Sequence, residues 1–438
     1  MDFTAMLGNT AFIIAAFIVV ISIIVAIHEY GHYIVGRWCG IHAETFSIGF
    51  GKVLFSRVDK RGTRWQVAAL PFGGYVKFLG DANAASYGSE EVAPEVNPRN
   101  TMHGAPLWAR AATIIAGPLF NFILAIAIFA GTLMYQGRPS DPVVFEAEYN
   151  LPPQFQSELQ PGDQIIAAGD IVFGAEDAGV DELPVTDRVD YTVVRDGEEI
   201  VVQGPYPVPP RLAGVNPRSA ADDAGMKVDD VITAINGEEI RAFADIVTYV
   251  NAADGDALDL TVWRDGETID ISLAPRRSDL PLAEGGFETR WLIGISGTEF
   301  FQAAREPIGL WDAIVSGTQE LWWRITTNLS GLWHVFSGSI STCNISGPVA
   351  IAQASGTMAE QGPANYILFI GVLSAAVGLL NLLPIPILDG GHLVFHAYEA
   401  VFRRKPNDKV MQGLMVVGIS MIATLMIFAL LNDTILCP

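Results

Sequence analysis

The chain has 438 residues, of which 50% are hydrophobic and 17% charged, and its mean hydropathy is +0.33. This balance indicates membrane-spanning segments and excludes an ordinary soluble enzyme. The formal net charge is −22, with most acidic side chains between residues 138 and 305, so we expect no nucleic-acid partner.

The first apolar segment, residues 8–34, is long enough to cross a bilayer and contains His28-Glu29-Tyr30-Gly31-His32. On a helix, histidines four residues apart share one face, with the spacing that two ligands of one zinc ion need. Glu29 is then placed to take a proton from water at the metal. This pattern also occurs by chance, but ionisable groups are costly inside a membrane, which favours a functional site. We predict a first span over residues 1–36.

Residues 37–106 are basic and are therefore predicted to be cytoplasmic. Within them, residues 45–58 and 64–78 are rich in aromatic and β-branched side chains around a turn, which predicts a β-hairpin. A hairpin in lipid must line a protein cavity to satisfy its backbone, so we expect it against the spans and near the zinc. A surface hairpin is the alternative. Residues 82–100 are predicted to be a mobile loop.

Residues 107–137 form the second predicted span. Pro118 is expected to kink this helix or to face a neighbouring helix. Asn121 is expected to hold helices together rather than to act in catalysis.

The acidic region contains a weak internal repeat, in which residues 159–170 parallel residues 226–237, and Arg-Asp-Gly-Glu recurs. The repeat predicts two tandem α/β modules, over residues 138–210 and 211–300. The second module resembles a bacterial PDZ domain, and the first is a shorter, degenerate copy.

Residues 301–365 are predicted to hold an amphipathic helix over 307–337, followed by a connection to the third span. This helix carries four of the nine tryptophans, which favours a membrane interface. Packing against the exported modules is the alternative.

The third span is predicted over residues 366–392, followed by a basic cytoplasmic loop over 393–410 and a fourth span over 411–438. The third span ends in Asn381-Leu-Leu-Pro-Ile-Pro-Ile-Leu-Asp389-Gly. A catalytic zinc site normally has three protein ligands, so one more is needed, and Asp389 is a costly charge that a metal would explain. On residue types alone, other candidates for this third ligand remain, namely His392, His42, His103, His334 and His396.

These motifs in this order, with the hairpin glycines Gly49 and Gly51, resemble the site-2 protease family of intramembrane zinc metalloproteases over essentially the whole chain. The resemblance implies a polytopic α-helical membrane protein with four transmembrane helices, a membrane-associated β-hairpin or sheet, and tandem exported PDZ-like α/β domains. It implies one zinc ion per chain, with His28, His32 and Asp389 as ligands and Glu29 as the general base.

The resemblance also implies that Asn381, Pro386, Gly49, Phe50 and Gly51 bind substrate. The implied reaction is cleavage of the transmembrane segment of single-pass proteins, such as anti-sigma-factor-like proteins and remnant signal peptides. It follows a first cleavage, in regulated intramembrane proteolysis and stress response.

The implied location is the bacterial inner membrane, with both termini and the PDZ-like modules in the periplasm. The lipid bilayer and the substrate are the implied partners, and the second module could bind peptide or protein C-termini. The competing interpretations are a non-catalytic membrane scaffold with PDZ modules and a metal transporter.

Overall fold

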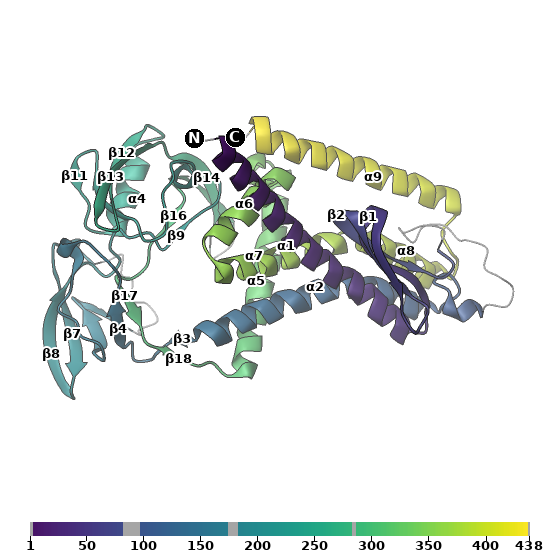
Figure 1. Cartoon of the computed structure of the whole chain (residues 1–438), viewed down its shortest axis with the longest axis horizontal. Coiled ribbons are helices and arrows are strands. Elements are labelled where there is room, and N and C mark those ends of the chain that lie inside the picture. The colour runs from purple at the N-terminus through teal and green to yellow at the C-terminus, as the bar shows by residue number, and fades with distance from the viewer. Residues whose placement is uncertain (1–2, 82–96, 174–182, 283–285, 437–438) are drawn as a thin grey trace. The chain divides into compact units, whose positions relative to one another are not determined.

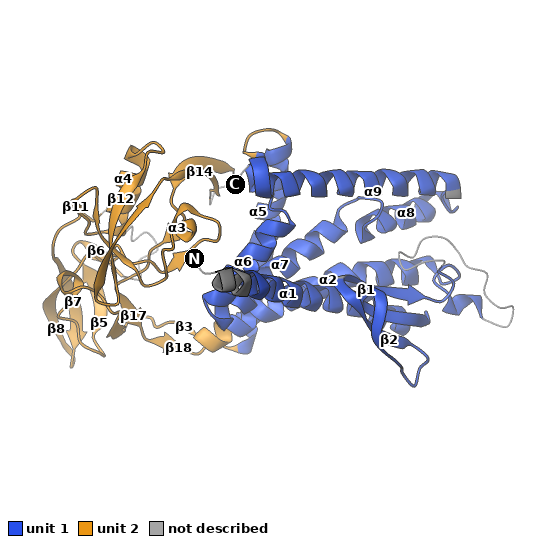
Figure 2. Ribbon diagram, turned by 45° about the horizontal axis from the view of Figure 1, so that its top comes forward, with its two compact units in different colours: residues 1–132, 310–336, 342–438 blue, residues 133–309, 337–341 orange. Residues whose placement is uncertain are grey.

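The computed structural model describes residues 3–81, 97–173, 183–282 and 286–436. The chain divides into two compact units (Figure 2). Unit 1 consists of residues 1–132, 310–336 and 342–438, and unit 2 of residues 133–309 and 337–341. Long helices dominate unit 1, and short strands dominate unit 2 (Figure 1).

Four helices of unit 1 are long and apolar enough to cross a membrane. They are α1 (Phe3–Trp38), α2 (Leu107–Gln136), α7 (Pro363–Leu382) and α9 (Asp408–Leu431). Their number confirms the prediction of a polytopic membrane protein with four spans.

The third span is shorter than predicted, because α7 ends at Leu382. Pro384 and Pro386 lack the N–H groups that would continue the helix, so the chain turns instead. A new helix, α8 (Asp389–Phe402), then begins at Asp389 and occupies much of the segment predicted as a cytoplasmic loop.

The helices α1 and α2 approach closely where glycine replaces a larger side chain. A Cβ added to Gly31 would lie 2.4 Å from the main-chain oxygen of Ala116, which no real side chain tolerates. Pro118 lies inside α2, and the helix runs through it without a break. Nearer the beginning of α1, Val20 and Ile24 pack with Ile370 of α7 in one apolar cluster.

Two further helices of unit 1 are α5 (Leu310–Phe336) and α6 (Pro348–Glu360). The helix α5 matches the predicted amphipathic segment, and its Leu321 packs with Ala125 and Phe129 of α2 while its tryptophans stay exposed. The helix α6 occupies a segment predicted as a connection. Its start is set by a contact that is remote in sequence: the carboxylate of Asp433 accepts hydrogen bonds from the main-chain N–H groups of Gly347 and Ala350.

The predicted hairpin is confirmed as the antiparallel pair β1 (Ala43–Val58) and β2 (Arg64–Phe78). Both strands bend, so that Thr45 pairs with Lys77 and also with Arg64. The bend in β1 falls at Gly49 and Gly51, which have φ angles of 89° and 84°, in the left-handed region that glycine tolerates. As a result, residues 74–78 form an outer edge of this small sheet.

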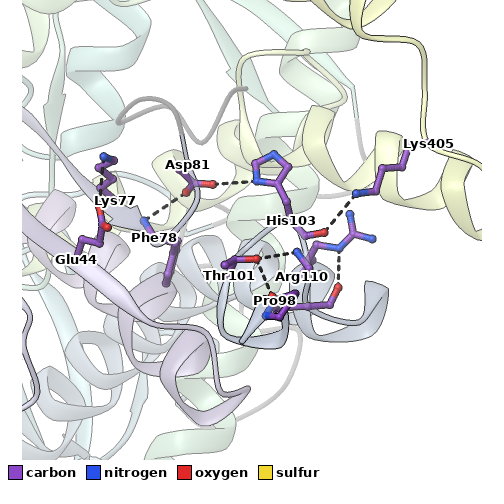
Figure 3. A network of polar contacts seen from close by, with 11 residues as sticks. Glu44, Lys77, Phe78, Asp81, Pro98, Thr101, His103, Arg110 and Lys405 are labelled. Atoms are coloured by element: carbon purple, nitrogen blue, oxygen red, sulfur yellow. Dashed lines mark hydrogen bonds and ion pairs between the residues drawn. The ribbon is translucent and has the colours of Figure 1, made fainter. Parts of the chain in front are cut away.

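The segment after the hairpin is tied to the beginning of α2 by polar contacts (Figure 3). The buried carboxylate of Asp81 pairs with Nδ1 of His103 at 3.6 Å, and the main-chain oxygen of His103 accepts from Lys405 Nζ at 3.3 Å. Nearby, Arg110 of α2 forms a two-pronged ion pair with Glu399 of α8, at 2.7 and 3.0 Å. Most of the predicted mobile loop lies outside the described residues.

Unit 2 contains two four-stranded sheets with the same strand order, β6-β5-β7-β8 and β11-β10-β12-β13. The first consists of β5 (Gln164–Ala168), β6 (Ile171–Val172), β7 (Val189–Arg195) and β8 (Glu198–Gly204). The second consists of β10 (Val231–Ile235), β11 (Glu238–Glu239), β12 (Leu258–Arg264) and β13 (Glu267–Leu273). The short helices α3 (Ala220–Asp223) and α4 (Phe243–Ala252) belong to the second repeat.

The two repeats also share a buried ion pair at matching positions. In the first repeat, Arg195 donates to both carboxylate oxygens of Asp163, at 2.8 and 2.7 Å. In the second, Arg264 donates to both oxygens of Asp230, at 2.6 and 2.7 Å. The internal repeat predicted from the sequence is therefore a repeat of structure.

The second repeat is inserted into the first. The strand β4 (Phe145–Glu148) pairs with β17 (Phe301–Ala303), and β3 (Arg138–Pro139) pairs with β18 (Arg305–Glu306). Within the second repeat, β9 (Gly214–Val215) pairs with β16 (Ile295–Ser296), and β14 (Arg276–Pro281) pairs with β15 (Phe287–Leu292). Phe300 and Phe301 complete the apolar core of the first repeat, which the sequence alone had placed entirely before residue 211.

Candidate metal centre

Three predicted ligands meet in unit 1. His28 and His32 lie one turn apart on α1, with their Nε2 atoms 3.2 Å from each other. Asp389, the first residue of α8, places Oδ2 at 3.1 Å from Nε2 of His28 and at 3.5 Å from Nε2 of His32. The turn at Pro384 and Pro386 therefore brings a carboxylate to the two histidines.

The arrangement of these atoms fits a zinc ion. Zinc binds nitrogen and oxygen ligands at about 2.0–2.1 Å in a tetrahedron, so two ligand atoms of one ion lie about 3.3 Å apart. The three separations just given lie close to that value. In addition, Oδ2 of Asp389 is buried and accepts no hydrogen bond. Among the described residues, this is the one group of three histidine, cysteine or acidic side chains close enough to share a metal.

A cavity of about 220 Å³ adjoins the three ligands. Glu29 lines it beside the two histidines, from the same turn of α1. The outer edge of β2 contributes a second wall: a Cβ on Gly74 would lie 3.2 Å from Cγ of Glu29 and 2.9 Å from a methyl of Val25. The remaining wall residues are Tyr75, Val76, Phe78, Met102, Thr113, Ile114, Asn381, Ile387, Leu388 and His392.

The helix α2 also contacts both imidazoles, and it reaches their Nδ1 atoms. Nδ1 of His32 lies 2.8 Å from the main-chain oxygen of Thr113, and Nδ1 of His28 lies 3.2 Å from the side-chain amide of Asn121. Between them, Gly117 leaves room for the rings. Sequence reasoning interpreted Asn121 only as a contact between helices and assigned Thr113 and Gly117 no role. The sequence signal that could have identified Asn121 is a single amide side chain in an otherwise apolar span, one turn after Gly117-Pro118.

The predicted substrate-binding residues are not all at the cavity. Asn381 lines it, and its amide donates to the main-chain oxygen of Val377 at 3.0 Å. Pro386 instead packs beside Gly391 and Gly418.

Gly49, Phe50 and Gly51 do not line the cavity either, and they lie at the bend of β1. The Phe50 ring stacks on Tyr75, with ring centroids 6.0 Å apart.

Of the rival histidines, His392 lines the cavity. His103 pairs with Asp81, and His334 contacts the main-chain oxygen of Ser330 at 2.7 Å. His42 and His396 are likewise absent from the three-residue group.

Comparison with known proteins agrees with this site. The sequence pattern of peptidase family M50 matches residues 16–425. A protein of Agrobacterium fabrum, provisionally named a zinc metalloprotease, is 36% identical over 428 residues, covering 96% of this chain and 95% of the relative. A provisionally named zinc metalloprotease of Rhizobium meliloti is 35% identical, with 98% of each chain covered. The regulator of sigma-E protease of Salmonella typhimurium is 32% identical, covering 96% of this chain and 98% of the relative. The chain therefore belongs to peptidase family M50, the family of site-2 proteases, and is a membrane zinc metalloendopeptidase.

Proposed function

We propose that this endopeptidase binds one zinc ion through His28, His32 and Asp389 and cleaves peptide bonds within the membrane, with Glu29 as the general base. The observation that carries the proposal is the convergence of three ligand atoms from α1 and α8 around one point beside Glu29. A zinc ion held there supplies Lewis acidity, which polarises a carbonyl and acidifies water.

In this proposal, Glu29 moves the proton. Its carboxylate lies in the cavity wall next to the ligands, so it can accept a proton from the attacking water. It then returns that proton to the nitrogen of the leaving peptide. No other carboxylate besides Asp389 lines this cavity in the described part of the chain, and Asp389 is occupied as a ligand.

The substrate class follows from the place of the site. His28 and His32 lie within a span, so the peptide reaches them from the membrane. A transmembrane helix hides its carbonyls in hydrogen bonds between successive turns, so the substrate must unwind before attack. Residues 74–78 of β2 pair with β1, and four of them line the cavity, namely Gly74, Tyr75, Val76 and Phe78. They can therefore take up the unwound peptide as an added strand.

The remaining candidate substrate residues support this binding in different ways. Asn381 lines the cavity and can exchange its contact with Val377 for one with the peptide. Gly49, Phe50 and Gly51 shape the bend that presents β2, and Pro386 shapes the turn that presents Asp389.

Unit 2 is proposed to select substrates. Its two similar repeats are interpreted as PDZ-like modules on the periplasmic side of the inner membrane, where both termini also lie. They would exclude single-pass proteins that still carry a bulky exported domain, so cleavage follows a first protease, as in regulated intramembrane proteolysis. Anti-sigma-factor-like proteins and remnant signal peptides fit this class. The second repeat, which has the helix α4, is the candidate for binding protein C-termini.

The catalytic proposal is tested with the full chain purified in detergent and a model single-pass substrate. The wild type should cleave, and a zinc chelator should stop it. Glu29→Gln should keep its zinc and lose cleavage, whereas His28→Ala and Asp389→Ala should lose both. His334→Ala is the matched control, because His334 lies on α5 outside the three-residue group. A wild type that binds zinc without cleaving any transmembrane substrate would favour the scaffold alternative.

Substrate roles need separate variants. Asn381→Ala should raise KM while zinc content stays unchanged, and full cleavage efficiency in membranes would remove its role. Deleting residues 140–300 should allow cleavage of substrates that retain their exported domain. Unchanged discrimination between trimmed and untrimmed substrates would contradict the selection role of unit 2.

A further inference from the structure

The contacts that α2 makes with the two histidines decide which ring nitrogen carries the proton. A main-chain carbonyl can only accept a hydrogen bond, so the contact of His32 with Thr113 requires an N–H at Nδ1. In the neutral ring, Nε2 then keeps its lone pair. That nitrogen is the one that faces Asp389. Thr113 thus holds His32 in the tautomer that can bind a metal.

Asn121 can do the same for His28, but only in one of two orientations. Its side chain is fully buried, with Nδ2 facing Nδ1 of His28 and Oδ1 left without a hydrogen-bond donor. In this orientation the amide donates to Nδ1, and the ring proton is at Nε2, where it blocks a metal. A half-turn of the amide places Oδ1 against His28, which requires an N–H at Nδ1 and frees Nε2.

The half-turn also places a hydrogen-bond donor, the Nδ1–H group of His28, against Oδ1 of Asn121. The amide N–H groups then take the place that the oxygen leaves, so hydrogen bonding of the amide alone does not choose between the two orientations. The choice follows from His28, whose Nε2 can bind a metal only when Oδ1 faces Nδ1. The main-chain oxygen of Asn121 accepts from Ser374 of α7, at 2.9 Å. This bond goes to the main chain and leaves the side-chain amide free to turn. Both residues are fully buried, so the side-chain amide contacts His28 without competition from bulk water.

We propose that Asn121 is a positioning residue whose amide oxygen accepts a hydrogen bond from Nδ1 of His28 and so frees Nε2 for zinc. The inference rests on the proposed role of His28 as a zinc ligand. It assigns α2 a function in the site although α2 contributes no ligand. Partners of this kind change metal affinity, because they orient the ring and raise the basicity of the ligating nitrogen.

The test uses zinc affinity, measured by competition with a chelator, in the full-length Glu29→Gln variant in detergent, so that no proteolysis occurs. Asn121→Leu should weaken zinc binding about 10–100-fold. Asn121→Asp keeps an acceptor and should restore binding to within a few-fold of the parent. Ser374→Ala is the matched control, because it removes a buried hydrogen bond to Asn121 without changing the contact with His28.

A second readout follows the proton directly. With ¹⁵N-labelled histidine, neutral His28 in the metal-free parent should be protonated at Nδ1, and Asn121→Leu should lose this preference because no acceptor then faces Nδ1. A neutral His28 protonated at Nε2 in the metal-free parent would overturn the inference, even if Asn121→Leu does not fold.

Two results of the affinity measurement would overturn the proposal. The first is that Asn121→Leu binds zinc as tightly as the parent. The second is that Ser374→Ala weakens zinc binding as much as Asn121→Leu does, which would indicate that helix packing alone sets the affinity. If instead the unmodified wild type neither binds zinc nor cleaves, it is the proposed function that fails.

Discussion

A Cβ placed on Gly117 would lie 2.3 Å from Nε2 of His32 and 2.8 Å from Nε2 of His28. The metal-binding atoms of both rings therefore face a position on α2 where only hydrogen fits. We predict that Gly117→Ala displaces the rings and weakens zinc binding, by about 10-fold or more, as losses of supporting contacts do. Zinc content per purified chain measures the effect.

Gly131 is the matched control for this prediction. It lies in the same helix, and a Cβ there would meet no atom within 4 Å. Gly131→Ala should keep full zinc content. Full zinc content in Gly117→Ala as well would show that the rings can shift without loss of the site.

The ion pair of Arg110 with Glu399 should support the metal centre from a distance. Both side chains are largely buried, and the pair joins α2 to the helix that begins at Asp389. Arg110→Leu leaves the Glu399 carboxylate without its partner, which should cost about 3–5 kcal/mol of stability. Zinc affinity should fall as well, because α8 is less firmly held.

The double variant Arg110→Leu/Glu399→Leu serves as the control, because replacing both charges removes the uncompensated one. It should recover most of the lost stability in reversible unfolding of the detergent-solubilised chain. If the double variant is as unstable as Arg110→Leu alone, the unpaired charge is not the cause.

The start of α6 should depend on Asp433, which accepts hydrogen bonds from two main-chain N–H groups there. Asp433→Ala removes this cap and should cost about 0.5–2 kcal/mol. We expect faster amide exchange over the first turn of α6. The neighbouring Thr434→Ala, which loses only an exposed contact within its own turn, should leave this exchange unchanged.

The first repeat of unit 2 should lose stability in acid. Hydrogen bonds from Arg195 hold the pKa of Asp163 below its ordinary value. A lower pKa in the folded state means that the stabilisation is complete above the unfolded value of about 3.9 and disappears as the pH falls through the folded pKa. Asp163→Asn should therefore be less stable at neutral pH, by about 1.5–3 kcal/mol, and less sensitive to acid.

Pulsed amide exchange at β5 and β7, after incubation of the full chain at each pH, follows this stability. The exposed Glu198→Gln variant, at the first residue of β8, should behave like the wild type. Acid sensitivity that is identical in Asp163→Asn and the wild type would contradict the role of this pair.

Much of unit 1 could be predicted because its signals are local. Spans follow from long apolar runs, and the hairpin follows from strand-forming residues around a turn. The meeting of Asp389 with the two histidines could also be proposed, because a charge in an apolar segment needs a partner. The sequence did not reveal the contact of Asn121 with His28, because a single amide in an apolar span gives the same pattern whether it joins two helices or orients a metal ligand.

The other differences arise from contacts between residues far apart in the chain. The helix α6 begins where Asp433 accepts hydrogen bonds from its first turn, and the sequence around Gly347 does not predict that contact. Likewise, the first repeat is completed by Phe300 and Phe301, on a strand that follows the whole second repeat. A local sequence pattern indicates which secondary structure a segment prefers, but it does not indicate which distant segment will pack against it.

The insertion of the second repeat into the first sets an order for folding during synthesis. All strands of the second repeat are available once Ser296 has left the ribosome, whereas the first repeat lacks β17 until Ala303 has followed. The second repeat can therefore fold before the first, although most of the first repeat is synthesised earlier. Until β17 is available, the first repeat has an unpaired strand and an incomplete core. Stalling synthesis at the length at which Ser296 has emerged from the ribosome and Phe301 has not should yield a protease-resistant second repeat beside a still sensitive first one.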